Sequence, residues 1–480
     1  MLFNSLLFLF FLPTTFCLYW FVFNKKLSNQ NLFLVAASYF FYACWDIRFL
    51  GLIILSTLID FFVGNKIFNS KNNKRKIFLF LSIFSNITIL AFFKYFNFFI
   101  ESFDDLINMI GYELQNKFLI NIILPVGISF YTFQTMSYTI DIYNNKIKPT
   151  NNLISFAAFV SFFPQLVAGP IERASNLLPQ MLRERKFHFE KAYEGIILII
   201  WGFFKKIVIA DSLSPIVNEI FDNYSELGGF TLLLGIFYFS FQIYCDFSGY
   251  SDIAIGTAKI FGIDLMTNFK FPYFSKSIPE FWKRWHISLS TWFRDYIYIP
   301  LGGSLGSTNK TIRNIFIIFV LSGFWHGANW TFIFWGLIHA LFYIPFYLTK
   351  KYKIIVFPFL QKNTDNALFN NIKIVFTFIV VMTAWIFFRS DSLKMSFKII
   401  NEILFNPTFT NILNPYNNLE GLYYLIYVVI FIVMDRFMMK TDHLMNFSYF
   451  KKTFIISVLS FITIFLIQLE VNDVFIYFQF

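Results

Sequence analysis

The chain has 480 residues, of which 57% are hydrophobic, 22% aromatic and only 14% charged. A soluble domain of this size has no interior large enough for so much apolar surface, and apolar runs of about 18 residues or more recur along the chain, as in transmembrane proteins. The net charge of +11 does not indicate nucleic-acid binding, because the lysines and arginines cluster in short loops between apolar runs. The cysteines, Cys17, Cys44 and Cys245, show no metal or redox spacing and are expected to be small buried hydrophobes.

The first third of the chain is predicted to be a series of membrane spans. The first apolar run has no basic leader and no small-residue cleavage site, so we expect it to be a retained span. Residues 31–68 are about twice as long as one crossing and predict a hairpin, followed by spans at 77–99 and 118–138. Residues 153–170 lie between two basic loops and contain FFPQLVAGP, which predicts a segment that enters the membrane and turns back at its Pro and Gly residues.

The rest of the chain adds further spans around a semi-polar region at residues 246–313. These spans are predicted at 194–210, 230–245, 372–389, 421–437 and 453–472. The pattern predicts an all-α polytopic membrane protein with about 10–12 spans plus re-entrant and interfacial helices. We expect one integral-membrane domain, made of N-terminal spans (1–115), a core with the catalytic segment (116–350), and C-terminal spans with a tail (351–480).

Within the semi-polar region, residues 277–303 predict one helix lying along the cytoplasmic face of the membrane. Ser277 and Glu280 have the spacing of a capping box, and Pro279 falls in the first turn. Aromatic and apolar residues recur at helical spacing and form one stripe, as in interfacial helices. The stripe consists of Trp282, Trp285, Leu289, Trp292, Phe293 and Tyr296.

Basic side chains of the same segment suggest a binding role. Lys283, Arg284 and Arg294 could meet an anionic ligand, such as the phosphates of a coenzyme or carrier protein. The alternative is a structural anchor without chemistry. Upstream, Asp246 and Asp252 come at the end of a predicted span, where they either position a partner or cap a helix.

Two histidines, His326 and His339, lie within LSGFWHGANWTFIFWGLIHA, a run typical of a membrane interior. From Arg313 to His326 is about 20 Å of helix, less than the ~30 Å hydrocarbon core, so His326 is predicted to lie at membrane depth. The glycines of GFWHGAN predict a turn at this point. An ionisable group there marks a polar pathway or a reacting site, and a neutral imidazole can accept a proton from a hydroxyl. A structural core histidine, a metal ligand and a transporter's proton relay are the alternatives, although the segment offers too few ligands for a metal.

Several stretches closely resemble the bacterial branch of the membrane-bound O-acyltransferase superfamily. They are LPVGISFYTFQTMSYTIDIY (124–143), FFPQLVAGPIER (162–173), YCDFSGYSDIAIG (244–256), FWKRWHISLSTWFRDYIYIPLGG (281–303) and GFWHGANWTFIFWGLIHA (323–340). The resemblance covers roughly residues 120–345 and is greatest to the membrane components of alginate and peptidoglycan O-acetyltransferases, with the D-alanyl transferase of teichoic acids more distant. It implies a helical bundle around a transmembrane tunnel in the bacterial cytoplasmic (inner) membrane. The implied donor is acetyl-CoA or another acyl thioester, with no tightly bound cofactor and no metal.

The resemblance also implies roles for individual residues. His326 corresponds to the histidine taken to be the base of acyl transfer, and His339 to a second histidine common in this branch. His286 is the weaker candidate, with a structural role as its alternative. The substrate-binding residues that we infer are Trp325, Asn329, Trp285, His286, Arg284, Arg294, Asp295 and Asp246.

The C-terminal sequence VNDVFIYFQF resembles the tail of the small helper protein of teichoic-acid D-alanylation and the tails of some peptidoglycan acetyltransferases. The resemblance implies that the Tyr477 hydroxyl receives the acyl group and passes it to a periplasmic SGNH-type transferase. We therefore expect peptidoglycan to be the acetylated polymer, with alginate, another exopolysaccharide or teichoic-acid D-alanylation as alternatives. A hydrophobic terminus packed on its last span is the structural alternative for the tail. From other classes, the alternatives are a transporter without covalent chemistry and a non-catalytic scaffold.

Overall fold

In the computed structural model, every regular element of the described residues is a helix. The described residues are 1–111, 120, 122–352, 366–409, 420–441 and 447–466. The chain divides into two compact units. The first unit comprises Met1–Ile196 and Ala254–Met266, and the second comprises Ile197–Ile253 and Thr267–Phe480. The predicted subdivision at residues 115 and 350 stays a prediction.

The first unit contains the helices of the predicted N-terminal spans and those at the start of the predicted core. They are α1 (Leu6–Cys17), α2 (Leu27–Ala43), α3 (Leu50–Asn69), α4 (Asn73–Leu90), α5 (Phe96–Met109), α6 (Ile128–Tyr143), α7 (Leu153–Ser161), α8 (Phe163–Leu166) and α9 (Ala174–Met181). Short π- or 3₁₀-helical segments join several of them: η1 (Leu18–Val22), η2 (Ile47–Phe49) and η3 (Ala91–Tyr95). The helices α2 and α3 form the pair predicted for residues 31–68.

The predicted break in residues 153–170 is present, because α7 ends at Ser161 and α8 is a separate helix of four residues. The backbone at Gly127 packs closely against the backbone at Leu166 in this part of the first unit. A Cβ on Gly127 would lie 2.4 Å from the Leu166 carbonyl oxygen, and its φ of +76° also favours glycine. The broken helix is confirmed, while its re-entrant path through a membrane stays a prediction.

The second unit contains most of the semi-polar region and the C-terminal helices. Its elements are η4 (Phe204–Asp211), α11 (Ser212–Asp222), η5 (Pro272–Phe274), α13 (Ile278–Arg284), α14 (Ile287–Phe293), η6 (Arg294–Tyr298), α15 (Thr308–His326), α16 (Trp330–Tyr352), α18 (Ala367–Arg389), α19 (Leu393–Phe405), α20 (Glu420–Tyr423), α21 (Leu425–Thr441) and α22 (Tyr449–Phe465). Two helices have residues in both units: α10 (Phe189–Phe203) and α12 (Gly229–Ile260).

Three sequence expectations were wrong. The span predicted to end at residue 245 continues as α12 to Ile260, so Asp246 and Asp252 cap no helix end. The single helix predicted at 277–303 is divided into α13, α14 and η6. Cys17 and Cys44 are exposed, and among the cysteines only Cys245 is buried.

The division between α13 and α14 has a clear cause. His286 takes a left-handed backbone conformation, with φ of +42°. Backbone hydrogen bonds to an upstream segment replace helical ones. The Lys270 N–H donates to the Arg284 carbonyl, and the Ile287 N–H donates to the Asn268 carbonyl, both at 2.9 Å. The start of α13 was predicted correctly, because the Ser277 hydroxyl accepts from the Glu280 N–H at 3.3 Å.

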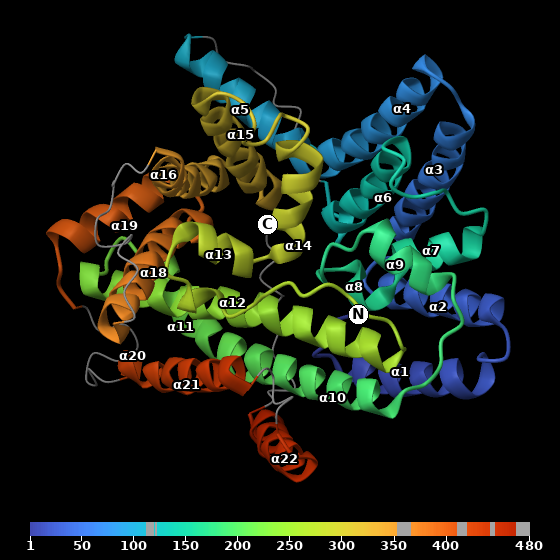
Figure 1. The fold of residues 1–480 in the computed structure, drawn as a ribbon. Coiled ribbons are helices and arrows are strands. Elements are labelled where there is room, and N and C mark those ends of the chain that lie inside the picture. The colour runs from blue at the N-terminus through green and yellow to red at the C-terminus, as the bar shows by residue number, and fades with distance from the viewer. Residues whose placement is uncertain (112–119, 121, 353–365, 410–419, 442–446, 467–480) are drawn as a thin grey trace. The chain divides into compact units, whose positions relative to one another are not determined.

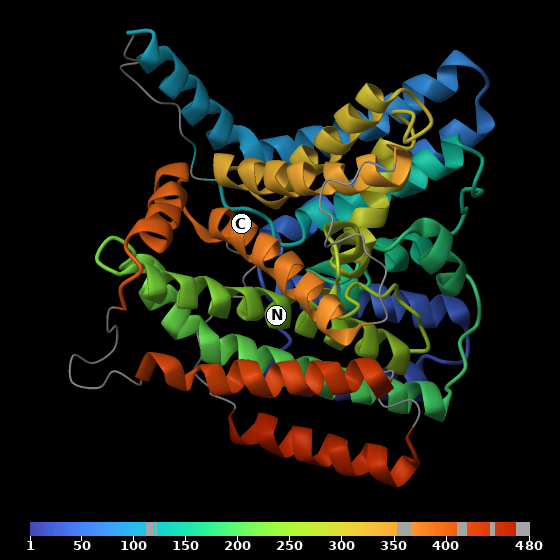
Figure 2. The same cartoon turned by 60° about the vertical axis from the view of Figure 1, so that its left-hand side comes forward.

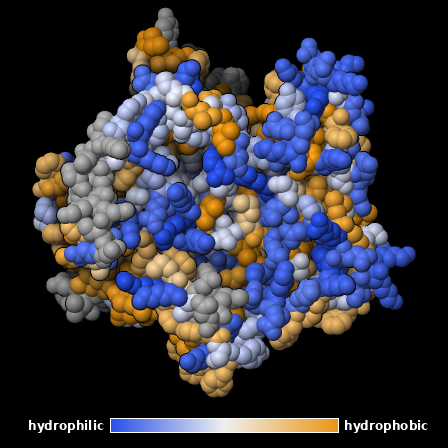
Figure 3. All heavy atoms as spheres, viewed as in Figure 1, coloured by the Kyte–Doolittle hydropathy of each residue, from blue (hydrophilic) through white to orange (hydrophobic). Residues whose placement is uncertain are grey.

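By length and composition, five helical stretches of the described residues are long and apolar enough to cross a membrane. They are Ile47–Asn69, Asn73–Met109, Gly229–Ile260, Trp330–Tyr352 and Ala367–Arg389. Apolar side chains also cover exposed helix faces, as Figure 3 shows over α22, where Phe450, Phe454 and Phe461 are 64–81% exposed. Such faces suit hydrocarbon rather than water. The prediction of an all-α polytopic membrane protein is confirmed, and the total of about 10–12 spans stays a prediction.

The helices α15 and α16 form a closely packed hairpin in the second unit, side by side in Figure 1 and Figure 2. Glycines permit the approach: a Cβ on Gly323 would lie 2.1 Å from the Phe332 carbonyl oxygen, and one on Gly336 would lie 2.2 Å from that of Phe319. The hairpin turns directly after His326 and carries His339 on its second helix. The predicted glycine turn in GFWHGAN is therefore present.

Candidate active site

His326 is the last residue of α15 and lies among aromatic rings. Its side chain is 3% exposed. The ring centroids of Trp325 and Trp335 are each 5.0 Å from that of the imidazole, and that of Phe388 is 5.3 Å away. Gly327 permits the turn that follows, since a Cβ there would lie 2.0 Å from the Phe332 ring. The fold thus places this imidazole at a helix end, inside an apolar aromatic environment.

His339 is fully buried on α16 and accepts a hydrogen bond from an indole. The Nε1–H of Trp282 donates to its Nδ1 at 3.3 Å. Because an indole nitrogen can only donate, Nδ1 carries no proton, and a neutral ring must carry its proton on Nε2. The ring of Phe281 lies parallel to the imidazole at a centroid distance of 6.0 Å.

One indole contacts both imidazoles. The ring of Trp335 lies 5.0 Å from that of His326 and 4.8 Å from that of His339, in edge contacts with both. We call His286, Trp325, His326, Trp335, His339, Trp282 and Phe388 the histidine–aromatic cluster. The two predicted catalytic histidines are therefore brought together by the fold, although thirteen residues and a turn separate them in the chain.

His286 joins the cluster from the break between α13 and α14. Its imidazole centroid is 6.3 Å from that of His326, and its Nδ1 lies 3.0 Å from Oδ1 of Asn268. The Ser288 hydroxyl donates to the same oxygen at 2.9 Å. Complete burial lowers the pKa of His286 to about 3, so this ring is neutral at physiological pH. These contacts fit the structural alternative for His286 and bring it close to His326.

The predicted tryptophans are buried in the second unit. Trp325 is 4% exposed and adjoins His326. Trp285 is 2% exposed and packs against Phe281 at 5.5 Å and Trp385 at 5.1 Å. Trp325 therefore belongs to the cluster, while Trp285 packs against other aromatic rings of the same unit.

The predicted polar ligands Arg284, Arg294 and Asp295 are in ion pairs. The Arg284 guanidinium lies 2.6 Å from the Glu280 carboxylate, and that of Arg294 lies 2.7 Å from Asp295. Arg294 is more than half exposed. Nothing in this geometry tests donor binding, so the predicted role of these side chains stays a prediction.

Asn329 has a local structural role at the hairpin turn. Its Oδ1 accepts from the Thr331 N–H at 3.0 Å, which caps the first turn of α16, and its Nδ2 donates to the Asp391 carbonyl at 2.8 Å. This side chain holds the start of α16 and its neighbouring loop together. The predicted substrate contact of Asn329 stays a prediction.

Asp246 lies in a different buried cluster. Lys206 Nζ is 2.8 Å from Asp246 and 2.7 Å from Asp211, and Lys205 Nζ is 2.7 Å from Asp252. We call these five residues the lysine–aspartate cluster. Its partners come from η4 and α12, where a Cβ on Gly202 would lie 2.6 Å from the Gly249 carbonyl oxygen.

Sequence reasoning missed several members and supports of the histidine–aromatic cluster. Trp335 has a local signal that was overlooked, because it lies one helical turn before His339. Trp282 was placed only on an apolar stripe, while Phe388 and Asn268 have no local signal that points to a histidine. Tyr477 lies outside the described residues, so its predicted role as acyl carrier stays a prediction.

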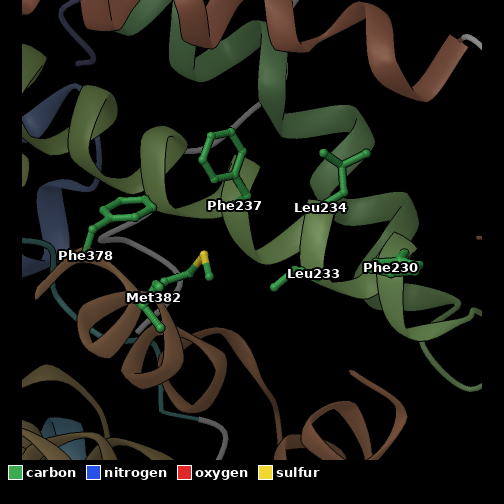
Figure 4. A pocket seen from close by; sticks show the side chains of 7 residues that line it. Phe230, Leu233, Leu234, Phe237, Phe378 and Met382 are labelled. Atoms are coloured by element: carbon green, nitrogen blue, oxygen red, sulfur yellow. The ribbon is translucent and has the colours of Figure 1, made fainter. Parts of the chain in front are cut away.

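An apolar pocket of about 360 Å³ opens elsewhere in the second unit, between α12 and α18 (Figure 4). Every side chain that lines it is apolar: Phe230, Leu233, Leu234, Phe237, Phe378, Ile379 and Met382. It includes none of the predicted site residues. This pocket can take up hydrocarbon but offers no group for acid–base chemistry.

The fold is that of an all-α membrane protein, and comparison with known proteins defines its family and enzymatic class. The family model described as MBOAT, membrane-bound O-acyltransferase family, matches residues 145–389, so the chain belongs to this family. The match includes both histidines of the hairpin and extends to the end of α18. The predicted family, its enzymatic class and the multi-pass membrane location are thereby confirmed, while the inner membrane in particular stays a prediction.

Three relatives illustrate the range of substrates. A probable alginate O-acetylase of Azotobacter vinelandii is 40% identical over 402 residues, 83% of this chain and 77% of that protein. A peptidoglycan O-acetyltransferase of Helicobacter pylori is 36% identical over 433 residues, covering 83% and 79%. A teichoic acid D-alanyltransferase of Bacillus subtilis is 32% identical over 233 residues, covering 46% and 58%. All three names describe acyl transfer.

Proposed function

We propose that this protein transfers an acetyl group from a cytoplasmic thioester, acetyl-CoA, for the O-acetylation of a polysaccharide outside the bacterial cytoplasmic membrane. The observation that carries the proposal is the burial of His326 at the end of α15, among aromatic rings and next to a second buried histidine. Such an environment keeps an imidazole neutral and able to accept a proton. The relatives from Azotobacter vinelandii and Helicobacter pylori, whose alignments cover about 80% of both chains, are both named for O-acetylation.

The chemistry requires one base and one activated carbonyl. His326 takes the proton of an acceptor hydroxyl, and the hydroxyl oxygen forms a bond to the thioester carbonyl carbon. The carbon–sulfur bond then breaks, and the thiolate of coenzyme A leaves and receives a proton. The products are an acetyl ester and free coenzyme A.

We propose Tyr477 as the first acceptor. Its acetyl ester would then be passed to a periplasmic partner with an SGNH-type transferase domain, which acetylates the polymer. The support is the sequence of the tail, F-x-Y-x-x-F, since these residues lie outside the described part of the chain.

The polymer has two candidates. The tyrosine tail favours peptidoglycan, whereas the relatives named for alginate favour an alginate-like exopolysaccharide by a few per cent of identity. Measuring ester-linked acetate in peptidoglycan and in exopolysaccharide from a deletion strain separates them. Peptidoglycan is the wrong polymer if only the exopolysaccharide loses acetate.

The experiment that tests the enzymatic proposal uses the purified full-length protein in detergent with acetyl-labelled acetyl-CoA. The wild-type protein should release free coenzyme A and acquire label on a C-terminal peptide that contains Tyr477. His326→Gln should lower the rate by about 10²–10⁴-fold, as expected for loss of a general base. A transporter of the intact donor would release no coenzyme A and acquire no label, and a scaffold would be unaffected by His326→Gln.

A further inference from the structure

One face of α16 carries three buried polar groups in succession. Thr331, Trp335 and His339 are four residues apart, so they lie along one face over about 12 Å of helix. Each is 0% exposed. In the part of the chain that the structure describes, the Thr331 hydroxyl, the Trp335 Nε1–H and the His339 Nε2 have no hydrogen-bond partner. Buried polar groups are normally paired, so this face is suited to an acceptor from outside the chain.

The hydrogen bond from Trp282 determines the tautomer of the neutral His339 ring. Since Nδ1 accepts the Trp282 N–H, the neutral ring presents Nε2 as an N–H donor and has no other lone pair to offer. In this tautomer His339 cannot take a proton from a hydroxyl. It can only donate a hydrogen bond, as can the indole of Trp335.

The ring of Trp335 lies next to the proposed base, and the ring of His339 lies next to Trp335. The Trp335 ring contacts both His339, at 4.8 Å, and His326, at 5.0 Å. During acyl transfer, negative charge develops on the carbonyl oxygen of the thioester, close to the base that deprotonates the acceptor. N–H donors that are fixed in an apolar site stabilise such a charge strongly, because no water has to reorganise.

We propose that the His339 Nε2–H and the Trp335 Nε1–H together bind the carbonyl oxygen of the acyl group, and that Trp282 is a positioning residue that keeps His339 in its donor tautomer. The inference rests on the proposed function. As the acceptor oxygen adds to the carbonyl carbon, the carbonyl π electrons move to its oxygen, where the two N–H groups hold the charge. When the carbon–sulfur bond breaks, the electrons return and the thiolate leaves.

The test measures kcat and KM for acetyl-CoA with the full-length protein. Trp335→Phe removes one N–H and keeps an aromatic ring, and we expect kcat to fall by about 10²-fold with little change in KM. His339→Phe should have at least the same effect, whereas His339→Gln, which restores an N–H donor, should recover part of the rate. Trp385→Phe is the matched control, because the Trp385 Nε1–H already donates to the Tyr273 hydroxyl at 3.2 Å.

The role of Trp282 is tested by combining variants. Trp282→Phe alone should lower kcat less than His339→Phe, and it should have no further effect in the His339→Gln protein if it acts only through the tautomer of His339. A purely structural tryptophan would lower the rate in both backgrounds.

Two results would overturn the inference while leaving acetyl transfer intact. One is an equal effect of Trp335→Phe and Trp385→Phe. The other is a His339→Gln protein as inactive as His339→Phe, which would indicate a base or a packing role. If the wild-type protein itself releases no coenzyme A, the proposed function fails first.

Discussion

The second unit holds two buried polar clusters whose polar groups are used differently. In the lysine–aspartate cluster, Lys205 and Lys206 lie 2.7–2.8 Å from carboxylates, so each cation is compensated within the chain. In the histidine–aromatic cluster, Trp335 and His339 have N–H groups without acceptors among the described residues. Buried charges need partners to be tolerated, and unpaired donors destabilise a fold unless something else binds them. The contrast separates a cluster that holds helices together from one that, in our proposal, binds a substrate.

The largest effect is expected in the lysine–aspartate cluster. Lys205→Met leaves Asp252 with an uncompensated charge and should lower the free energy of unfolding by about 3–5 kcal/mol. Lys205→Met combined with Asp252→Asn removes both charges and should recover most of the loss, because the pair itself contributes little net stability. Denaturant unfolding of the purified protein in mild detergent measures both. A double variant as unstable as the single one would mean that this pair has a role beyond mutual compensation.

The next effect concerns the hairpin that carries the two histidines. Gly323→Ala places a Cβ 2.1 Å from the Phe332 carbonyl oxygen, so α15 and α16 must move apart. We expect a loss of about 1–3 kcal/mol in unfolding free energy, together with a fall in acetyl transfer as His326 shifts relative to α16. The matched control is Gly51→Ala in α3, where a Cβ would meet no atom within 4 Å. Equal stability of the two variants would contradict the close packing of the hairpin.

Local sequence signals predicted much of this arrangement. Helical periodicity and the capping pattern at Ser277 predicted the start of α13, and the glycines around His326 predicted the turn between α15 and α16. Both are properties of adjacent residues, which short-range hydrogen bonds and backbone preferences determine. The family resemblance then identified His326 and His339 as the histidines of interest.

The partners of these histidines could not be predicted in the same way. Trp282 and His339 are 57 residues apart, and the tautomer of His339 depends on that one hydrogen bond. The division at His286 arises from backbone pairing with residues near Asn268, a competition that helical periodicity does not reveal. In the lysine–aspartate cluster, sequence showed aspartates near the end of a predicted span but not the lysines of η4 that pair with them.

A smaller effect on the unfolding free energy is expected from a change in pH. The histidine–aromatic cluster favours a neutral His286 ring, whereas the lysine–aspartate cluster holds charged groups. Burial lowers the pKa of His286 below its ordinary value of 6.5, so between about pH 6.5 and 3 the unfolded chain binds a proton that the folded protein does not. The stability contributed by the neutral ring is present above pH 6.5 and is lost as the pH falls. Between about pH 7 and 5.5, the wild-type protein should lose about 1 kcal/mol more than His286→Gln. Unfolding curves of both proteins at the two pH values measure the difference, and parallel losses would show that His286 is protonated in the fold.

The smallest effect on stability is expected for an exposed ion pair that belongs to neither cluster. Arg294 is 57% exposed and pairs with Asp295, so Arg294→Gln should change the unfolding free energy by less than about 1 kcal/mol. If this guanidinium meets the phosphates of the donor, the same variant should raise KM for acetyl-CoA about fivefold and leave kcat unchanged, because binding is lost equally in the ground and transition states. Arg48→Gln, which removes an exposed arginine paired with Asp46 in the first unit, should leave KM unchanged. Since screening weakens exposed charges, the rise in KM should also shrink as salt is added. Identical KM values for the two variants would show that Arg294 does not bind the donor. The proposed binding of the acyl group by the buried N–H donors would be unaffected.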